Sequence, residues 1–158
     1  MNDERAFLRH CIATLAYRAG KTLRDAPPGF AEYKASDTSR APIQILAHMS
    51  DLYDWALHLS KGERVWNDRE PGAWDAEVSR FFAALEAFDA FLSSGSRIEC
   101  DVARLFSGPI ADSISHAGQL AMLRRMFGSP IRGENYFKAD IEVGRVGLDQ
   151  AAPRREFD

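Results

Sequence analysis

Apolar residues recur every three or four positions along four segments of this chain, and breaks that contain proline or glycine separate the segments. This spacing matches the 3.6-residue period of an amphipathic α-helix with one buried face. It predicts helices over residues 3–23, about 40–60, 74–92 and about 109–127. Helices of roughly 18 to 22 residues, joined by connections of moderate length, are typical of an all-α four-helix bundle.

Local signals predict where these helices begin and end. Residues 27–29, Pro-Pro-Gly, end the first helix, and Thr38 or Ser39 is expected to cap the second, whose first turn tolerates Pro42. A short irregular stretch over residues 106–108 is expected before the fourth helix.

The C-terminal segment, residues 130–158, differs from the rest because it is rich in proline and glycine. Its brief alternation of Ile141 and Val143 is too short to build a sheet. We expect an ordered, extended C-terminal tail packed on the bundle and fraying near Arg154-Arg155. No linker divides the chain, so residues 1–158 are expected to form a single domain.

Composition excludes several classes of function. Hydrophobic residues make up 46%, charged residues 27%, and the formal net charge is −3. Without a basic stripe we expect no nucleic-acid partner, and without an apolar run of roughly 20 residues we expect no membrane span. Met1 to Arg5 does not resemble a secretory signal, and the two cysteines share no motif, so they are expected to be reduced thiols in a cytoplasmic protein.

A carboxylate and an imidazole lie four residues apart in the fourth predicted helix, at Asp112 and His116. Residues at this spacing lie on the same side of a helix. His48 interrupts the otherwise apolar stripe of the second predicted helix, so it could supply a third ligand from a facing helix. Three protein ligands with open positions for water or substrate are typical of a catalytic metal site, and helix bundles commonly build such sites. The residues therefore suggest a divalent-metal site.

The same residues allow a simpler interpretation, which stays open at the level of the sequence. Asp112 falls in the first turn of a helix, where a carboxylate interacts favourably with the helix dipole, and both histidines could be hydrogen-bonded core residues. If the metal site forms, Asp51 and Gln119 are candidates to orient the imidazoles, because each lies three residues after a ligand.

The fourth predicted helix carries apolar residues on two sides. One stripe continues from His116 through Leu120, and the other contains Ile110, Ile114 and Ala117. Burial on two sides predicts that the second stripe faces the tail or a second subunit.

Three parts of the sequence resemble the DinB/YfiT-like superfamily. They are Ile45 to Asp51 (ILAHMSD), His116 to Leu120 (HAGQL), and the segment from Glu134-Asn135-Tyr136 to Gly144. The resemblance follows nearly the whole chain in order and spacing. It implies an up-up-down-down four-helix bundle, a homodimer, and a divalent metal held by one histidine of the second helix and an HxxxH pair of the fourth.

Carried over by position, the resemblance assigns the metal to His48, Asp112 and His116. Asp112 stands where the family usually has a histidine, and Ala117 stands where an arginine is common. The carboxylate keeps three ligands and gives a set that suits Zn, Ni, Mn or Fe. Its negative charge should make a bound water less acidic than three neutral imidazoles would.

The resemblance also implies a choice of functions. Characterised members include metal-dependent transferases that join a low-molecular-weight thiol such as bacillithiol to an electrophile, and a mycothiol-dependent maleylpyruvate isomerase. A small-molecule substrate and a thiol cofactor are therefore expected. A metal-dependent hydrolase is the alternative enzyme, and a non-catalytic bundle with a structural or vestigial metal site is the alternative outside enzymes.

Overall fold

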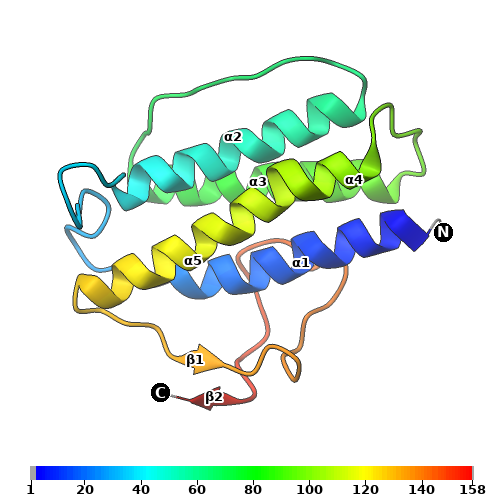
Figure 1. Cartoon of the computed structure of the whole chain (residues 1–158). Coiled ribbons are helices and arrows are strands. Elements are labelled where there is room, and N and C mark those ends of the chain that lie inside the picture. The colour runs from blue at the N-terminus through cyan, green and yellow to red at the C-terminus, as the bar shows by residue number, and fades with distance from the viewer. Residues whose placement is uncertain (1–2, 158) are drawn as a thin grey trace.

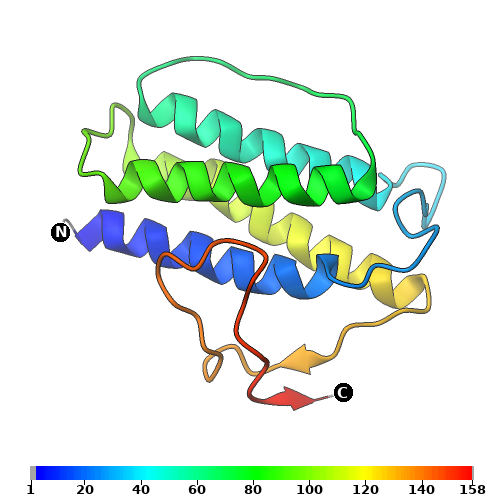
Figure 2. The same cartoon turned by 180° about the vertical axis from the view of Figure 1, so that it is seen from behind.

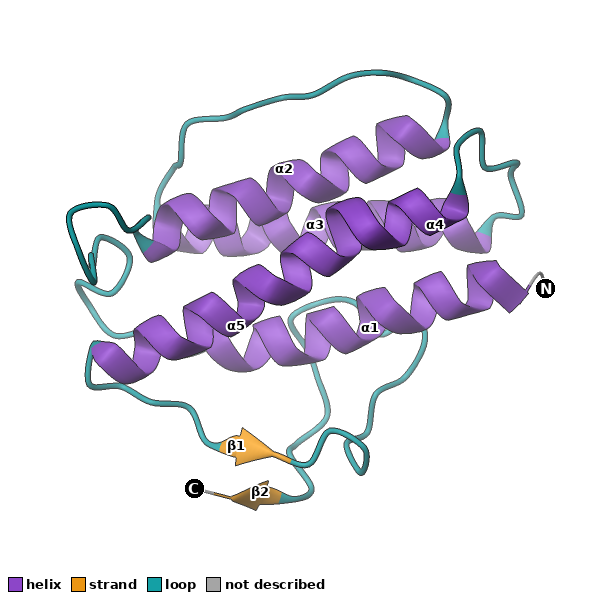
Figure 3. Ribbon diagram, in the orientation of Figure 1, coloured by secondary structure: helices purple, strands orange, loops and turns teal. Residues whose placement is uncertain are grey.

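The computed structural model describes residues 3–157, and the predicted all-α class is confirmed within that range (Figures 1 and 3). The long helices are α1 (Asp3–Leu23), α2 (Pro42–Ser60), α3 (Trp74–Ser93) and α5 (Ala111–Met126). The shorter elements are α4 (Val102–Leu105), the π-helical turn η1 (Phe106–Ile110), β1 (Gly133–Glu134) and β2 (Glu156–Phe157). The part of the single-domain prediction that concerns residues 1, 2 and 158 lies outside the described residues.

Each long helix packs against two others. Helix α1 contacts α3 and α5, and α2 contacts the same two helices. In Figures 1 and 2, α1 and α5 run in one direction while α2 and α3 run in the opposite direction. The order is therefore up-down-down-up, and the expected up-up-down-down order is wrong.

The linker of residues 61–73 explains this order. Fully extended, residues 61–73 reach roughly 43–47 Å, whereas the 19-residue α2 is about 28 Å long. The linker is therefore long enough to return along the full length of α2, and Figure 2 shows that α3 starts at the same end as α2.

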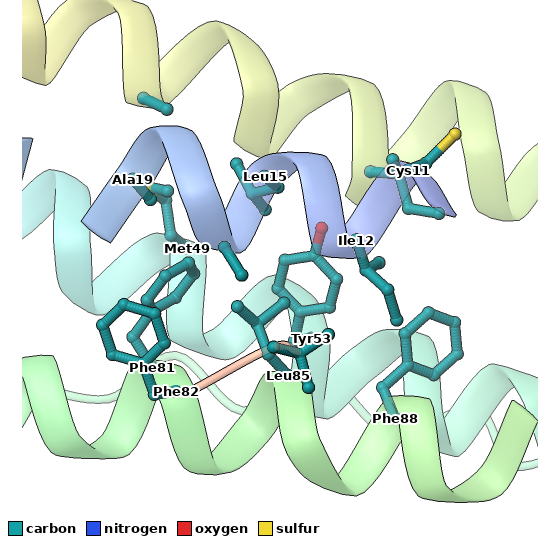
Figure 4. Packing of buried hydrophobic residues seen from close by; sticks show 14 of the residues in the cluster. Cys11, Ile12, Leu15, Ala19, Met49, Tyr53, Phe81, Phe82, Leu85 and Phe88 are labelled. Carbon is teal, nitrogen blue, oxygen red and sulfur yellow. The ribbon is translucent and has the colours of Figure 1, made fainter. Parts of the chain in front are cut away.

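Aromatic and aliphatic side chains of α1, α2 and α3 form the centre of the core (Figure 4). The Tyr53 ring of α2 contacts the Phe81 and Phe88 rings of α3, with centroids 6.2 Å and 6.0 Å apart. Burying rings of this size removes a large apolar area from water, which is the main force that holds the helices together.

The start of α2 differs from the prediction. The residue before its first turn is Ala41, which has no side-chain acceptor. Instead, the Ala41 N–H donates to Oε1 of Gln44 at 2.9 Å. The expected cap Ser39 bonds to Ser36 in the preceding loop. The side chain of Gln44, the third helical residue, thus supplies the one bond of a capping box that needs no capping side chain.

The segment before α5 is helical and not irregular as expected. Asp101 caps α4 by accepting the Ala103 N–H at 2.9 Å, and the π-helical turn η1 then joins α4 to α5. Pro109 lies inside this turn. A proline lacks an N–H and disturbs the regular α-helical bonding pattern, so a local π-turn accommodates it.

The C-terminal residues pair β1 with β2 in an antiparallel ladder, with Gly133 opposite Phe157. A Cβ at Gly133 would lie 2.6 Å from the Phe157 ring, so the glycine permits this close approach. The backbone carbonyl oxygen of Arg155 accepts the Asn135 N–H at 3.0 Å. Backbone pairing thus holds Arg155 beside β1, at the place where fraying was expected.

Glu134 connects β1 to α1. Its buried carboxylate accepts a hydrogen bond from the Tyr17 hydroxyl at 2.7 Å and from Lys21 Nζ at 3.1 Å. Lys21 also pairs with Glu156 of β2 at 2.6 Å. A buried carboxylate needs such partners because an unpaired charge away from water is costly.

Candidate metal centre

Helices α2 and α5 bring His48, Asp112 and His116 together. His48 lies in the middle of α2, whereas Asp112 and His116 occupy the first two turns of α5, which packs against α2. One ligand atom from each residue lies within 4.8 Å of the others. The side chains that the sequence singled out thus form a group that could hold a metal ion.

Asp112 lies close to both histidines, through a different oxygen for each, and its contact with His48 is within hydrogen-bond range. His48 Nε2 lies 3.3 Å from Asp112 Oδ2, and His116 Nε2 lies 3.4 Å from Asp112 Oδ1. Most N–H···O hydrogen bonds are about 2.9–3.0 Å long. Ligand atoms about 2.1 Å from a tetrahedral ion lie roughly 3.4 Å apart. Two imidazoles and one carboxylate are also a common donor set for divalent transition metals.

Gln119 orients one of the imidazoles. Its Oε1 lies 3.0 Å from His116 Nδ1, so the Nδ1–H donates to the amide oxygen. With its proton on Nδ1, the ring presents the Nε2 lone pair toward Asp112. Gln119 thus contacts the imidazole that the sequence suggested it would orient.

Asp51 has a different place from the one suggested. One of its oxygens accepts a hydrogen bond from Arg80 Nη1 at 2.6 Å, and the other accepts the Arg69 N–H at 3.1 Å. Arg80 also donates to Ala47 O. Asp51 therefore joins α2 to α3 and to the linker, and its bonding partners do not include His48.

The linker supplies a residue that the sequence did not single out. The Trp66 ring lies edge-on to the His48 ring, with centroids 5.9 Å apart, and also contacts Trp55 at 5.7 Å. The linker shows no helical or strand period that would predict its position. The one sequence signal for such a contact was the presence of a tryptophan in an otherwise polar segment.

Solvent reaches the group on the side of the carboxylate. The Asp112 side chain is 45% exposed, whereas the His116 side chain is 12% exposed. A hollow of about 210 Å³ adjoins His48, and its charged lining residues are Arg40, Asp51, Asp68, Arg69 and Glu70. A second hollow adjoins Asp112 and is bordered by Trp55 and Ser107. A small molecule can therefore approach the group from two sides.

The other histidines and the cysteines lie outside this group. His58 pairs with Glu63 at the end of α2, and His10 is exposed on α1. Neither Cys11 nor Cys100 forms a disulfide. Burial raises the pKa of the Cys11 thiol, which disfavours the reactive thiolate.

Comparison of the chain with protein-family models, curated proteins and solved structures gives no match. Within residues 3–157, no helix combines the length and apolar character that crossing a membrane requires.

Proposed function

We propose that this protein is a DinB-like four-helix bundle that binds a divalent metal through His48, Asp112 and His116 and transfers a low-molecular-weight thiol to an electrophile. The observation that supports this proposal most directly is the convergence of three ligand atoms within 4.8 Å from two packed helices. The sequence resemblance supports the choice of reaction. Its residues ILAHMSD and HAGQL contain two of the three ligands.

A metal held by these residues would act as a Lewis acid that lowers the pKa of a coordinated thiol. In the reaction, the thiol sulfur forms a bond to the electrophilic carbon. The leaving group departs with its bonding electron pair, and the thiol proton passes to solvent. Gln119 holds His116 in the required tautomer, and the exposed side of Asp112 leaves room for the small molecule.

Metal binding tests the first part of the proposal. The full chain, purified without a histidine tag and stripped with EDTA, is titrated with Zn²⁺, Ni²⁺, Mn²⁺ and Fe²⁺. We expect one bound ion per chain, and no binding after His48→Ala/His116→Ala. His58→Ala is the matched control because His58 is on α2 but pairs with Glu63. Equal metal content in the double variant and the wild type would contradict the site.

A conjugation assay tests the second part. Cysteine, glutathione, bacillithiol and mycothiol are each combined with 1-chloro-2,4-dinitrobenzene, which releases chloride, with and without added metal. We expect metal-dependent turnover with at least one thiol, lost in His116→Ala. Hydrolysis of ester or amide substrates without conjugation would instead support a metal-dependent hydrolase.

A non-catalytic bundle with a structural or vestigial metal site is the second candidate. The observation that favours it is Asp112, whose negative charge replaces a neutral imidazole of the family pattern. Metal binding without turnover in any of these assays would favour this candidate over the enzyme.

We also propose that the protein forms a homodimer, but not through the second apolar stripe of α5. Ile110 and Ala117 of that stripe belong to the same buried cluster as side chains of α1. The exposed Phe7 and Phe106 rings, 6.0 Å apart, offer another apolar surface. Light scattering at micromolar concentration is expected to give the mass of two chains. The mass of one chain would rule the dimer out.

A further inference from the structure

An apolar groove lies beside the candidate metal centre and is separate from the polar hollow next to His48. Its volume is about 310 Å³, and its lining residues are Ser39, Arg40, Ile45, Gln119, Met122 and Leu123. Ile45 and Leu123 are almost completely buried and lie at its base, whereas Met122 is 57% exposed. Methionine adapts its shape to different apolar ligands. The groove thus has an apolar base and an adaptable side wall.

Arg40 gives the groove a positive charge. Among residues 3–157, its guanidinium has no hydrogen-bond or ion-pair partner. Arg40 also borders the polar hollow, so it lies where the two hollows meet. A guanidinium binds a carboxylate through two parallel hydrogen bonds. A small molecule whose anionic group binds Arg40 would therefore place its apolar part in the groove.

Gln119 connects the groove to the metal centre. The residue lines the groove, and its amide oxygen holds His116 at 3.0 Å. A molecule in the groove therefore contacts the residue that orients a candidate metal ligand.

We infer that this groove binds a small carboxylate with an apolar body, with the carboxylate at Arg40 and the body over Ile45 and Leu123. The volume holds roughly ten water-sized units, so an acyl or aryl body of about six to eight carbon atoms fits. Binding needs no metal. We assign this carboxylate as the electrophilic substrate of the thiol transfer, and this assignment rests on the function proposed above.

Octanoate and its uncharged analogue octanamide test the inference in EDTA-treated full-length protein, by calorimetry and NMR. We expect octanoate to bind more tightly than octanamide. Arg40→Gln should weaken octanoate binding on the order of tenfold, with little effect on octanamide. Met122→Gln should weaken both probes because it places a polar amide over the apolar base. Arg125→Gln, an exposed arginine of α5 outside the groove, should change neither.

Several outcomes would overturn the inference. They are no octanoate binding at millimolar concentration, an equal effect of Arg40→Gln on both probes, or an Arg125→Gln effect as large as that of Arg40→Gln. Because the protein is metal-free, such a failure leaves the metal site intact. Failure of the wild-type protein to bind any of the tested metals would leave the octanoate result intact in turn.

Discussion

The indole of Trp66 lies edge-on against the imidazole of His48, with ring planes at 64° and centroids 5.9 Å apart. The surrounding linker is held by two buried carboxylates. Asp51 accepts the Arg69 N–H at 3.1 Å, and Glu77 accepts the Gly72 N–H at 2.9 Å. The linker thus places an aromatic wall beside a candidate metal ligand.

Removing this wall should weaken metal binding. Trp66→Ala opens His48 to water, and the apolar surroundings of a metal site control solvent access to it. We expect metal affinity to fall by roughly tenfold, and Trp66→Phe to retain most of it because a ring still covers the imidazole. Calorimetric titration measures both variants. Equal metal affinities of Trp66→Ala and wild type would show that the Trp66 ring does not affect metal binding.

Gln119→Leu should lower metal affinity by roughly 10- to 100-fold, because it removes the acceptor that fixes the His116 tautomer. Gly118→Ala is the matched control on the next residue. A Cβ at Gly118 meets nothing within 4 Å. That variant should keep wild-type metal affinity and stabilise the helix by about 0.5–1 kcal/mol. If Gln119→Leu keeps the metal affinity of the wild type, Gln119 has no role in metal binding.

Arg80→Met should destabilise the fold strongly. Asp51, only 1% exposed, would lose its charged partner at 2.6 Å. Breaking a buried pair in this way costs about 3–5 kcal/mol in the free energy of unfolding. Arg69→Met is the control, since its pair with Asp54 is partly exposed and should contribute about 0–1 kcal/mol. Urea unfolding compares the two, and similar losses would contradict the prediction.

Acid should weaken the attachment of β2. The hydrogen bond from Lys21 lowers the pKa of Glu156 in the folded protein. A lowered folded pKa contributes stability that is complete above the unfolded value of about 4.3 and is lost as pH falls through the folded value. Wild type should therefore be more stable than Glu156→Gln at pH 7, and the difference should vanish in acid.

Urea midpoints between pH 7 and pH 2 measure this difference. Glu99→Gln is the control, because the partner of Glu99 is the exposed Arg97 at a longer distance of 3.5 Å. A difference between wild type and Glu156→Gln that does not change with pH would contradict the role of Lys21.

Helical period predicted the long helices well because it follows directly from which residues are buried. The bounds of α1 agree with the prediction, and α3 begins at Trp74 as expected. The start of α2 was harder to predict because Ala41 has no capping side chain. The turn at Pro109 was misjudged because a proline is equally compatible with a helix start and with a π-turn.

The sequence predicted that the three residues of the candidate site lie together, but it did not predict their surroundings. Spacing placed Asp112 and His116 on one side of a helix, and the polar His48 stood out in an apolar stripe. The contact of Trp66 with His48 depends on how the aperiodic linker crosses α2. Asp51 has its partner on α3, and a pairing over this separation has no local signal.

The π-helical turn η1 has a consequence for the phase of the helix that follows it. Each residue of an α-helix advances the side-chain direction by about 100°. A π-turn bonds over five residues and takes up about one residue more than an α-turn in nearly the same rotation, so shortening η1 by one residue would leave Asp112 and His116 on nearly the same side of α5. The turn therefore absorbs one extra residue around Pro109 while two of the three candidate ligands keep their direction. A one-residue deletion in the regular helix between Asp112 and His116 would instead rotate His116 by about 100° relative to Asp112, with all three candidate ligand residues still in the sequence.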